Sequence, residues 1–391
     1  MNEILSELEK LAAQRAGELI ADRRGGVPLV EYGSTFIPEE LIRAAGANTY
    51  LMCSGGQQEA AEAVLDDMLG CMNPLARSIV GGFRLGNDEV SEHTDLVVTA
   101  VTDCHIGRLS ELLEFQGIRT AKVGVPPDWK KGIAFDYFVR SLRKMMGEVE
   151  KLTGRSADME LARKYFSETN RINTAFRRIN ELRKRPDQTM AFKDYMRLQH
   201  LSFIVGDTGL TASLLERLCD KLERARTTNH GAPRLIVIGR VIAIGDYQLI
   251  SLIDRCGAVV AAEMLDEGIR VSEKDVELEG DLLLNFARNR YLDKTPIDIF
   301  QPAWHTRMGK LRELIEECRA DGVIWYQLAF DEIYDMEYTC VANELRELGV
   351  PLLRLETNYS YTREELGQAK IQVENFIGGL CRSSNRKTIL L

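Results

Sequence analysis

Short apolar runs alternate with amphipathic stretches in the N-terminal third of the chain. The runs "ANTYLMC", "DLVVTAV" and "RTAKVGVP" are typical of buried strands, whereas "PEELIRAAG" and "IGRLSELLEFQG" have the spacing of helices. An order of strand, helix and strand predicts βαβ units, whose strands pair in parallel because a helix crosses between them. We therefore predict an N-terminal α/β domain over residues 1–135.

A long charged stretch interrupts this alternation. Residues 136–230 contain amphipathic segments such as "MAFKDYMRLQHLSFIV" and "TASLLERLCDKLERARTT", and we interpret them as a helical connecting segment. Apolar runs return at "PRLIVIGRVIA", "AVVAAEML", "VIWYQLA" and "PLLRLET", again separated by helical patterns. The predicted fold class is α/β, with two Rossmann- or flavodoxin-like parallel-sheet domains, residues 1–135 and 231–391, that face each other across a cleft.

Two stretches of the chain follow one plan. Residues 95–117 and 321–349 each contain an acidic residue, an apolar run, a polar corner, a helical pattern and a glycine. Cys104 lies at the first corner, nine residues after its stretch begins, and Asp331 lies at the second, ten residues after its stretch begins. A divergent duplication would explain this likeness, but so would the general similarity of βαβ units, and the sequence leaves both open.

Length and composition limit the class of protein. A chain of 391 residues is too long for one ordinary core, so two domains are expected. The apolar content of 45% and charged content of 28% are typical of soluble globular proteins, and the net charge of −9 argues against a nucleic-acid partner. Apolar runs stay well short of the roughly 20 residues that cross a bilayer, and the N-terminal segment has no signal-peptide pattern. We expect a cytoplasmic protein with no membrane partner.

The cysteines supply the candidate chemistry. There are eight of them, and no two have the CxxC spacing of a zinc ribbon or a thioredoxin motif. In a reducing cytoplasm we do not expect structural disulfides. If these cysteines bind a metal, the fold must bring distant ones together.

Three cysteines fall where α/β sheets bind ligands. Cys53 and Cys104 lie at predicted strand ends, and Cys71 lies near the start of a helix broken by Pro74. Ligands bind beyond the carboxyl ends of parallel strands, where helix N-termini lower the pKa of a cysteine and favour the thiolate. Three converging thiolates would suit an iron–sulfur cluster or zinc. The alternative is a cysteine that acts as a small buried hydrophobe, which is our interpretation for the remaining helical ones, namely Cys219, Cys256, Cys318 and Cys381.

Several motifs together resemble a known family. "IPEELIRAAGA", "LGCMNPLARSIVGGF", "DLVVTAVTDCHIGRLSELL" and "LETNYSYTREELGQAKIQVENF" follow one another along nearly the whole chain. They resemble the 2-hydroxyacyl-CoA dehydratase subunits, which are related to subunits of benzoyl-CoA reductase and to the double-cubane-cluster proteins. "LMCSGG" and "YDMEY" are most similar to the double-cubane branch.

The resemblance implies low-potential chemistry on a CoA thioester. In such dehydratases a [4Fe–4S] cluster held by three cysteines leaves one iron open to the thioester carbonyl oxygen. An ATP-hydrolysing iron–sulfur activator protein delivers an electron, and the resulting ketyl radical expels the hydroxyl group. A related reductase reaction is the other option. The resemblance also implies a homologous or identical second subunit, and it identifies Cys71 and Cys104 as the first cluster ligands, with Cys53 next.

The chain departs from the family pattern at the third ligand. The family supplies a cysteine after a late strand, and Asp331 stands at the corresponding corner here. Cys340 follows nine residues later and would face the crevice only if its helix begins late. No further cysteine lies in "RLGNDEVSEHT", so we do not expect a double cubane. Three outcomes remain open: a cluster held by Cys71, Cys104 and a substitute among Cys53, Asp331 and Cys340; a different metal; or a cluster-free partner subunit. For Asp331 the alternative is a helix N-cap.

Other polar residues are candidates for substrate contacts. Ser34 lies where the family lines its substrate pocket, and the alternative is a turn or cap before the helix at Pro38. His105 follows Cys104 and could act as a catalytic acid or base, unless it is a solvated residue of the first helical turn. The basic segment 176–185 could meet CoA phosphates through arginine, although such charge runs are usually solvated helix faces.

Overall fold

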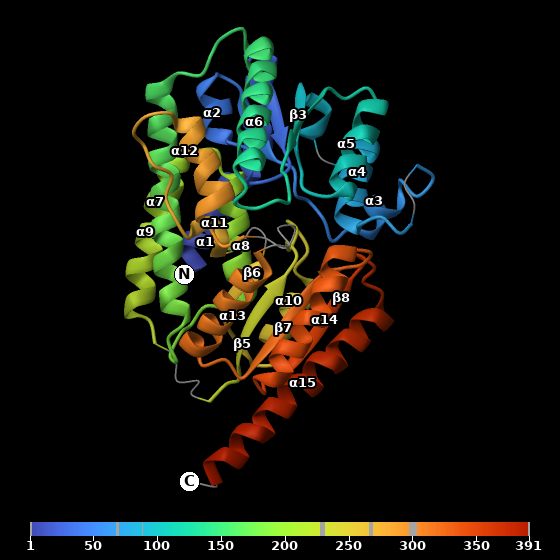
Figure 1. The fold of residues 1–391 in the computed structure, drawn as a ribbon, viewed down its shortest axis with the longest axis vertical. Helices are drawn as coiled ribbons and strands as arrows, with labels where there is room; N and C mark the ends of the chain where they lie inside the picture. The colour runs from blue at the N-terminus through green and yellow to red at the C-terminus, as the bar shows by residue number, and fades with distance from the viewer. Residues whose placement is uncertain are drawn as a thin grey trace.

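The computed structural model describes residues 2–67, 70–87, 89–226, 231–265, 269–296 and 303–389. Within these ranges the strands form two four-stranded parallel sheets with helices packed on them (Figure 1). The strands of the first sheet are β1 (Leu29–Tyr32), β2 (Asn48–Leu51), β3 (Leu96–Val101) and β4 (Thr120–Gly124). Those of the second are β5 (Arg234–Gly239), β6 (Val259–Leu265), β7 (Gly322–Leu328) and β8 (Leu352–Thr357). The predicted α/β class with two parallel-sheet domains is confirmed.

The central strands are buried on both faces, as parallel sheets require when helices cover each side. Every residue of β1 and β7 is buried, and five of the six residues of β3 are buried. The apolar runs that predicted strands correspond to β2 to β8. The sequence analysis did not predict β1, because its short run "LVEY" is interrupted by a glutamate.

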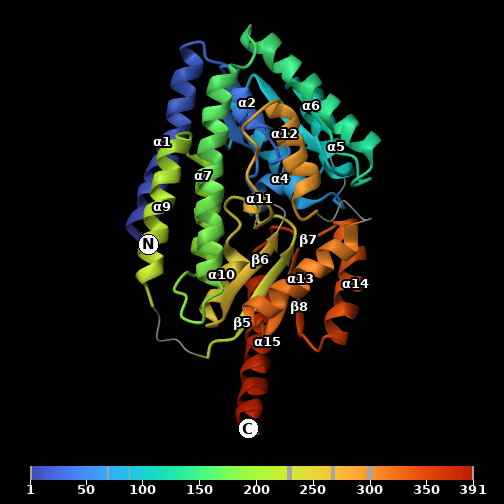
Figure 2. The same ribbon diagram turned by 60° about the vertical axis from the view of Figure 1, so that its left-hand side comes forward.

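The helices complete both domains and the region between them. They are α1 (Asn2–Arg24), α2 (Glu39–Ala44), α3 (Gln58–Glu62), α4 (Pro74–Leu85), α5 (Cys104–Phe115), α6 (Gly132–Thr153), α7 (Met159–Arg183), α8 (Phe192–Ile204), α9 (Thr208–Arg224), α10 (Gln248–Arg255), α11 (Ile269–Ser272), α12 (Leu282–Arg288), α13 (Trp304–Cys318), α14 (Glu332–Glu347) and α15 (Arg363–Ile389). The segment predicted to be helical forms α6 to α9, and α1 packs against α8 and α9. Figure 2 shows α1 beside α9. The domain boundaries at 135 and 230 stay predictions.

The two sheets share a strand order and a matching structural detail. The orders are β2-β1-β3-β4 and β6-β5-β7-β8, so the first, second, third and fourth strands of each sheet correspond. Asp95 lies just before β3. Its carboxylate accepts from the N–H of Leu29, and its own N–H donates to the Leu29 carbonyl, both at 2.9 Å. Asp321, just before β7, does the same with Arg234 at 2.8 and 2.7 Å. Generic βαβ geometry does not require an aspartate with these two hydrogen bonds before the third strand. Its presence in both halves therefore favours the duplication that the sequence left open.

The loops at the carboxyl ends of the sheets touch directly. The N–H of Ile244 donates to the carbonyl of Cys53 at 2.8 Å, and the N–H of Gly55 donates to the carbonyl of Ile244 at 3.0 Å. A Cβ atom at position 55 would lie 2.7 Å from both the Ala243 Cβ and the Tyr359 Oη. The close approach of the two domains therefore depends on glycine at this position.

Arginines of the basic segment 176–185 form ion pairs within the chain. Arg177 pairs with Asp275 at 2.8 Å, and Arg178 pairs with Asp220 at 2.9 Å, both on the surface. Arg183 is buried, with its guanidinium 2.5 Å from Glu263 of β6. These pairs favour a structural role for the segment over binding of CoA phosphates.

No helix among the described residues has the length and apolar content needed to cross a membrane.

Candidate functional site

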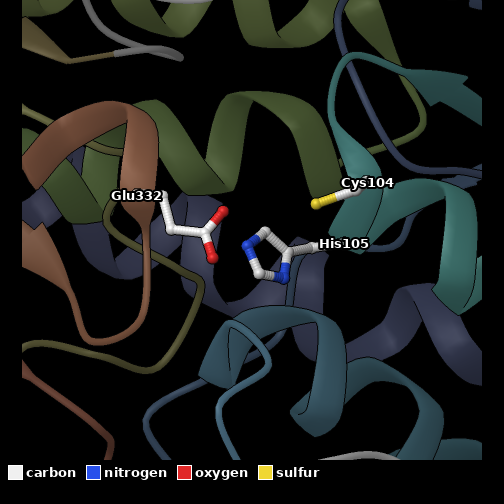
Figure 3. A group of neighbouring side chains, drawn as sticks. All are labelled: Cys104, His105 and Glu332. Atoms are coloured by element: carbon white, nitrogen blue, oxygen red, sulfur yellow. The ribbon is translucent and has the colours of Figure 1, made fainter. Parts of the chain in front are cut away.

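The third strands of the two sheets direct their following helices toward one place at the carboxyl ends of the strands, which we call the crevice. β3 leads into α5 and β7 leads into α14, and these helices begin with Cys104 and Glu332. The Cys104 sulfur, one ring nitrogen of His105 and one carboxylate oxygen of Glu332 all lie within 4.8 Å of one another (Figure 3). Cys104 and Glu332 are exposed, whereas His105 is buried. Residues 228 positions apart in sequence thus form one group of potential metal ligands or proton carriers.

The sequence analysis matched Cys104 with Asp331, but the helix starts in the structure shift this match by one residue. Asp103 is the N-cap residue of α5, and Asp331 is the N-cap residue of α14. The counterpart of Asp331 is therefore Asp103, and the counterpart of Cys104 is Glu332. The sequence analysis identified Cys104, His105 and Asp331 but missed Glu332, because corner residues were matched and helix starts were not.

A buried arginine joins the two N-cap residues. Arg240, directly after β5, donates from Nη2 to the Asp103 carboxylate at 3.0 Å, and its Nη1 lies 3.5 Å from Asp331 Oδ2. Its side chain is 6% exposed, and those of the aspartates are 4% and 3% exposed, so solvent screens these pairs weakly. Burial opposes ionisation of Asp103, but the Arg240 guanidinium and the N–H of Ile106 hold its pKa below the ordinary value. Arg240 therefore fixes the starts of α5 and α14 relative to each other.

The carboxylates of Asp103 and Asp331 accept different hydrogen bonds at the starts of α5 and α14. Asp103 accepts a capping hydrogen bond from the N–H of Ile106 at 2.9 Å. Asp331 makes no side-chain capping bond and instead accepts from Asn73 Nδ2 at 3.0 Å. The alternative interpretation of Asp331 as a helix N-cap is thus correct for its position, while its carboxylate serves the contact between domains.

Asn73 connects three parts of the crevice and was missed by the sequence analysis. Its Oδ1 accepts from the N–H of Leu75 at 2.8 Å, which caps α4. Its backbone N–H donates to His105 Nδ1 at 3.3 Å. In the neutral ring this bond leaves the proton on Nε2, which faces Glu332 (Figure 3). An asparagine directly before Pro74 was the available signal, since this is an N-cap followed by proline at N1.

The predicted cluster cysteines have different surroundings. Cys71 is exposed in the turn before α4. It lies two residues before Asn73, so the two Cα atoms are separated by at most about 7 Å. Cys71 is therefore near Asn73 along the chain, but among the described residues its sulfur is not one of the ligand atoms grouped with Cys104, and it stays a predicted cluster ligand. Cys53 is buried just after β2 and contacts the second domain through its carbonyl.

The remaining cysteines lie outside this group. Because α14 begins at Glu332, Cys340 lies about 12 Å along the helix from its start. The late helix start that would bring Cys340 to the crevice is therefore not observed. The interpretation as buried hydrophobes is right for Cys219 and Cys318, which are buried, and wrong for Cys381, which is exposed.

The crevice does not activate the Cys104 thiol. Burial raises its pKa, and the carboxylates of Asp103 and Glu332 raise it further. Burial, followed by the neighbouring negative charges, thus works against the thiolate that the helix N-terminus was expected to favour. A bound metal would have to displace this proton.

Ser34 forms the turn before α2, which was the alternative to a substrate contact in the sequence analysis. Its hydroxyl accepts from the N–H of Phe36 at 3.2 Å, and its carbonyl accepts from the N–H of Ile37 at 3.0 Å. These bonds form the turn that leads to α2, and Ser34 is not part of the group around Cys104.

The donor set can be compared with the cluster that the family resemblance implies. The group offers one thiol, from Cys104, and the second domain offers Glu332 at the helix start that corresponds to Cys104. The carboxylate of Asp331 is already bound by Arg240 and Asn73, so exposed Glu332 is the more available oxygen donor. Carboxylates bind iron, although less softly than thiolates. The observed donors are thus one thiol, one imidazole and one carboxylate, which suit iron or zinc, and a cluster would need a further thiolate such as the predicted Cys71.

Comparisons with known proteins identify the family of the chain. Residues 34–380 match the sequence model of the family "2-hydroxyglutaryl-CoA dehydratase, D-component". The "Putative dehydratase subunit YjiM" of Escherichia coli (strain K12) is 22% identical over 362 residues, covering 90% of this chain and 91% of that protein. Among solved structures, the glycosyltransferase SnogD from Streptomyces nogalater aligns with 93% of this chain and 100% of its own at 13% identity, and its TM-score of 0.17 carries no argument. The resemblance seen in the sequence is confirmed, and the chain belongs to the 2-hydroxyglutaryl-CoA dehydratase D-component family.

Proposed function

We propose that the chain is a subunit of a cytoplasmic 2-hydroxyacyl-CoA dehydratase-like enzyme, or of a related acyl-CoA reductase, with its site at the crevice around Cys104. The observation that carries the proposal is the convergence of Cys104, His105 and Glu332 at equivalent helix starts of the two domains. Family membership supplies the class of reaction.

Three side chains of the crevice would hold a [4Fe–4S] cluster. Cys71 and Cys104 supply thiolates, and Glu332 supplies a carboxylate. Cys53 stays the alternative third ligand that the sequence predicted. Such a cluster would supply low-potential electrons and an open Lewis-acidic iron.

The protein's own groups would orient the chemistry. The bond from the Asn73 N–H keeps the His105 proton on Nε2, on the side that faces Glu332. From there the Nε2–H of His105 can donate a hydrogen bond to Glu332 or to the hydroxyl group of a bound substrate. Arg240 keeps the two helix starts in register by binding Asp103 and Asp331.

Partners follow from the family description. The matched family is named as a component, and the relative as a subunit, of a dehydratase. We therefore propose a homologous second subunit, a CoA-thioester substrate and an ATP-dependent iron–sulfur activator protein.

A specific observation favours a second candidate function. The second domain brings a carboxylate, Glu332, and no cysteine to the group around Cys104, and burial and nearby carboxylates raise the pKa of Cys104. Both features would suit a cluster-free subunit that supports a catalytic homologue.

Iron and sulfide analysis separates the two candidates. The chain is purified anaerobically, reconstituted with iron and sulfide, and assayed alone and with its homologous subunit. About four irons per chain supports the catalytic subunit. No iron bound by this chain in either setting supports the cluster-free subunit.

A further inference from the structure

The turn between β7 and α14 contains a phenylalanine with an uncommon backbone conformation. Phe330 has a φ of 62°, in the left-handed region that favours glycine and asparagine, and the residue is 45% exposed. Tyr359 has a similar φ of 67°, but it is completely buried, so the packing around it holds the backbone there. Exposed Phe330 has less packing of this kind. Backbone strain clusters at active sites and ligand contacts, so a functional explanation is called for.

The fold does not require a phenylalanine with this conformation. Two residues, Thr102 and Asp103, separate β3 from α5 in the first half of the chain, whereas three residues separate β7 from α14. Asp103, at the position equivalent to Asp331, has an extended backbone with a φ of −151°. The first half thus makes the corresponding turn with one residue fewer.

Phe330 connects the crevice with a groove beside it. The residue precedes Glu332 by two positions, so the two Cα atoms are at most about 7 Å apart. Phe330 also lines a groove at the carboxyl ends of β7 and β8, where the N–H of Ala329 donates to the carbonyl of Thr357 at 2.8 Å. The other apolar side chains of this groove are Leu249, Ala329, Leu366 and Ala369. A ligand held at Glu332 could therefore extend an apolar chain along Phe330.

The charges of the groove disfavour the phosphate end of a CoA thioester. Arg354 is the cation on the described part of the wall, and its guanidinium already pairs with Asp335 at 2.6 Å and with Glu356. Glu356 and Glu365 both line the groove. Phosphates would be repelled by these carboxylates, whereas an acyl chain carries no charge.

We infer that Phe330 contacts the acyl chain of the bound thioester and makes binding depend on the length of that chain. The inference rests on the proposed function, which supplies a CoA thioester whose carbonyl is held at the crevice. The acyl chain then extends over Phe330 into the groove. Each methylene group that reaches the ring is removed from water together with part of the ring, so longer chains bind more tightly.

Four thioesters of graded length test this inference. Isothermal titration calorimetry compares 2-hydroxypropanoyl-, 2-hydroxybutanoyl-, 2-hydroxypentanoyl- and 2-hydroxyhexanoyl-CoA on the full-length chain, reconstituted anaerobically and combined with its homologous subunit. Reductant and activator are left out, so that no turnover occurs. In the wild type we expect the Kd to fall by about fourfold per added methylene, the gain typical of burying one such group.

Two substitutions at Phe330 separate the ring from the backbone. Asparagine adopts left-handed backbone readily, so Phe330→Asn should fold normally, but without the ring its Kd should fall by less than about twofold per methylene. Phe330→Tyr keeps the ring and should keep the wild-type dependence. Phe115→Asn is the matched control, because Phe115 is 87% exposed at the far end of α5, and it should also leave the dependence unchanged.

The possible failures are distinguishable. A wild type that binds the thioesters with no dependence on chain length, or a Phe330→Asn chain that keeps the wild-type dependence, would overturn the inference and leave the proposed function standing. If Phe330→Asn weakens only the binding of the homologous subunit, Phe330 belongs to the subunit interface and the inference is wrong. A wild type that binds none of the four thioesters would contradict the proposed function together with the inference.

Discussion

Cys104 and Glu332 hold equivalent positions in the two halves of the chain, each as the first residue of the helix after the third strand of its sheet. Their ligand atoms lie within 4.8 Å of each other and of a His105 ring nitrogen. Two halves with the same strand order have thus brought a sulfur donor and an oxygen donor close together. The predictions below follow from this arrangement and from the contacts that maintain it.

Replacing Glu332 with cysteine should strengthen iron binding at the crevice. The change provides a third thiolate at the position equivalent to Cys104, and thiolates hold iron–sulfur clusters better than carboxylates do. After anaerobic reconstitution, we expect iron release to a chelator to slow by about tenfold, the scale on which changes around a metal alter its affinity. Glu347→Cys, at the exposed end of α14, is the control, and an equal effect there would contradict the prediction.

Replacing Arg240 with methionine should destabilise the fold strongly. The guanidinium is the shared partner of two buried carboxylates, Asp103 and Asp331, and its loss leaves buried charge uncompensated. We expect the free energy of unfolding in urea to fall by about 3–5 kcal/mol. Arg354→Met removes ion pairs at the surface and should cost less than about 1 kcal/mol. Similar losses in the two variants would show that the bridge contributes little.

Gly55→Ala should disturb the contact between the two domains. The added Cβ would lie 2.7 Å from the Ala243 Cβ and the Tyr359 Oη, and the packed neighbours would have to move. Overpacking of this kind costs about 1–3 kcal/mol of unfolding free energy. Gly17→Ala in α1 meets no atom within 4 Å and should instead stabilise by about 0.5–1 kcal/mol. Two equal melting temperatures would argue against a tight contact at Gly55.

Two buried groups near the domain contact should give opposing pH dependences of stability. Burial raises the pKa of Asp246 from 3.8 to about 6, although the hydroxyls of Tyr326 and Tyr361 donate to it and lower the pKa. Burial lowers the pKa of His200 from 6.5 to about 4, and its ring bonds the Ile242 carbonyl at 2.9 Å.

The signs follow from proton binding in each state. Between pH 4 and 6 the folded chain keeps a proton on Asp246 that the unfolded chain has released, so this term falls as pH rises. Between pH 4 and 6.5 the unfolded chain protonates His200 and the folded chain does not, so that term rises with pH. Each spans about 3 kcal/mol, from a shift of roughly two pKa units.

Single substitutions should separate the pH-dependent contributions of Asp246 and His200 to stability. In Asp246→Asn, the unfolding free energy should rise more steeply from pH 4.5 to 6.5 than in the wild type, because only the His200 term remains. In His200→Gln it should fall over the same range. Urea titrations at three pH values measure the slopes, and equal slopes in all three proteins would contradict the assignment.

The fold was largely predictable because apolar runs of a buried parallel sheet stand out in sequence. The exception was β1, where Glu31 is fully buried and accepts from the Thr94 hydroxyl at 2.5 Å. A buried glutamate breaks the apolar pattern, and its partner lies 63 residues away. Strand detection therefore failed where a long-range polar contact replaces an apolar side chain.

The site was predictable only in part. Cys104 and His105 were found because they stand at a strand end, and Asp331 because it stands at the matching corner. Glu332 was missed because sequence spacing does not fix the residue at which a helix starts. Arg240 and Asn73 were missed because their roles depend on contacts between segments far apart in sequence, which no local pattern encodes.

The most direct test of the central claim is the spectrum of the reduced cluster in single cysteine variants. Anaerobically reconstituted wild-type chain, Cys71→Ser, Cys104→Ser and the control Cys381→Ser are reduced with a low-potential donor and compared by electron paramagnetic resonance, with iron counted in parallel. The account predicts about four irons and one cluster signal in the wild type and the control, with both lost or strongly reduced in each crevice variant. A wild-type chain without iron, or crevice variants that keep the full signal, would contradict it.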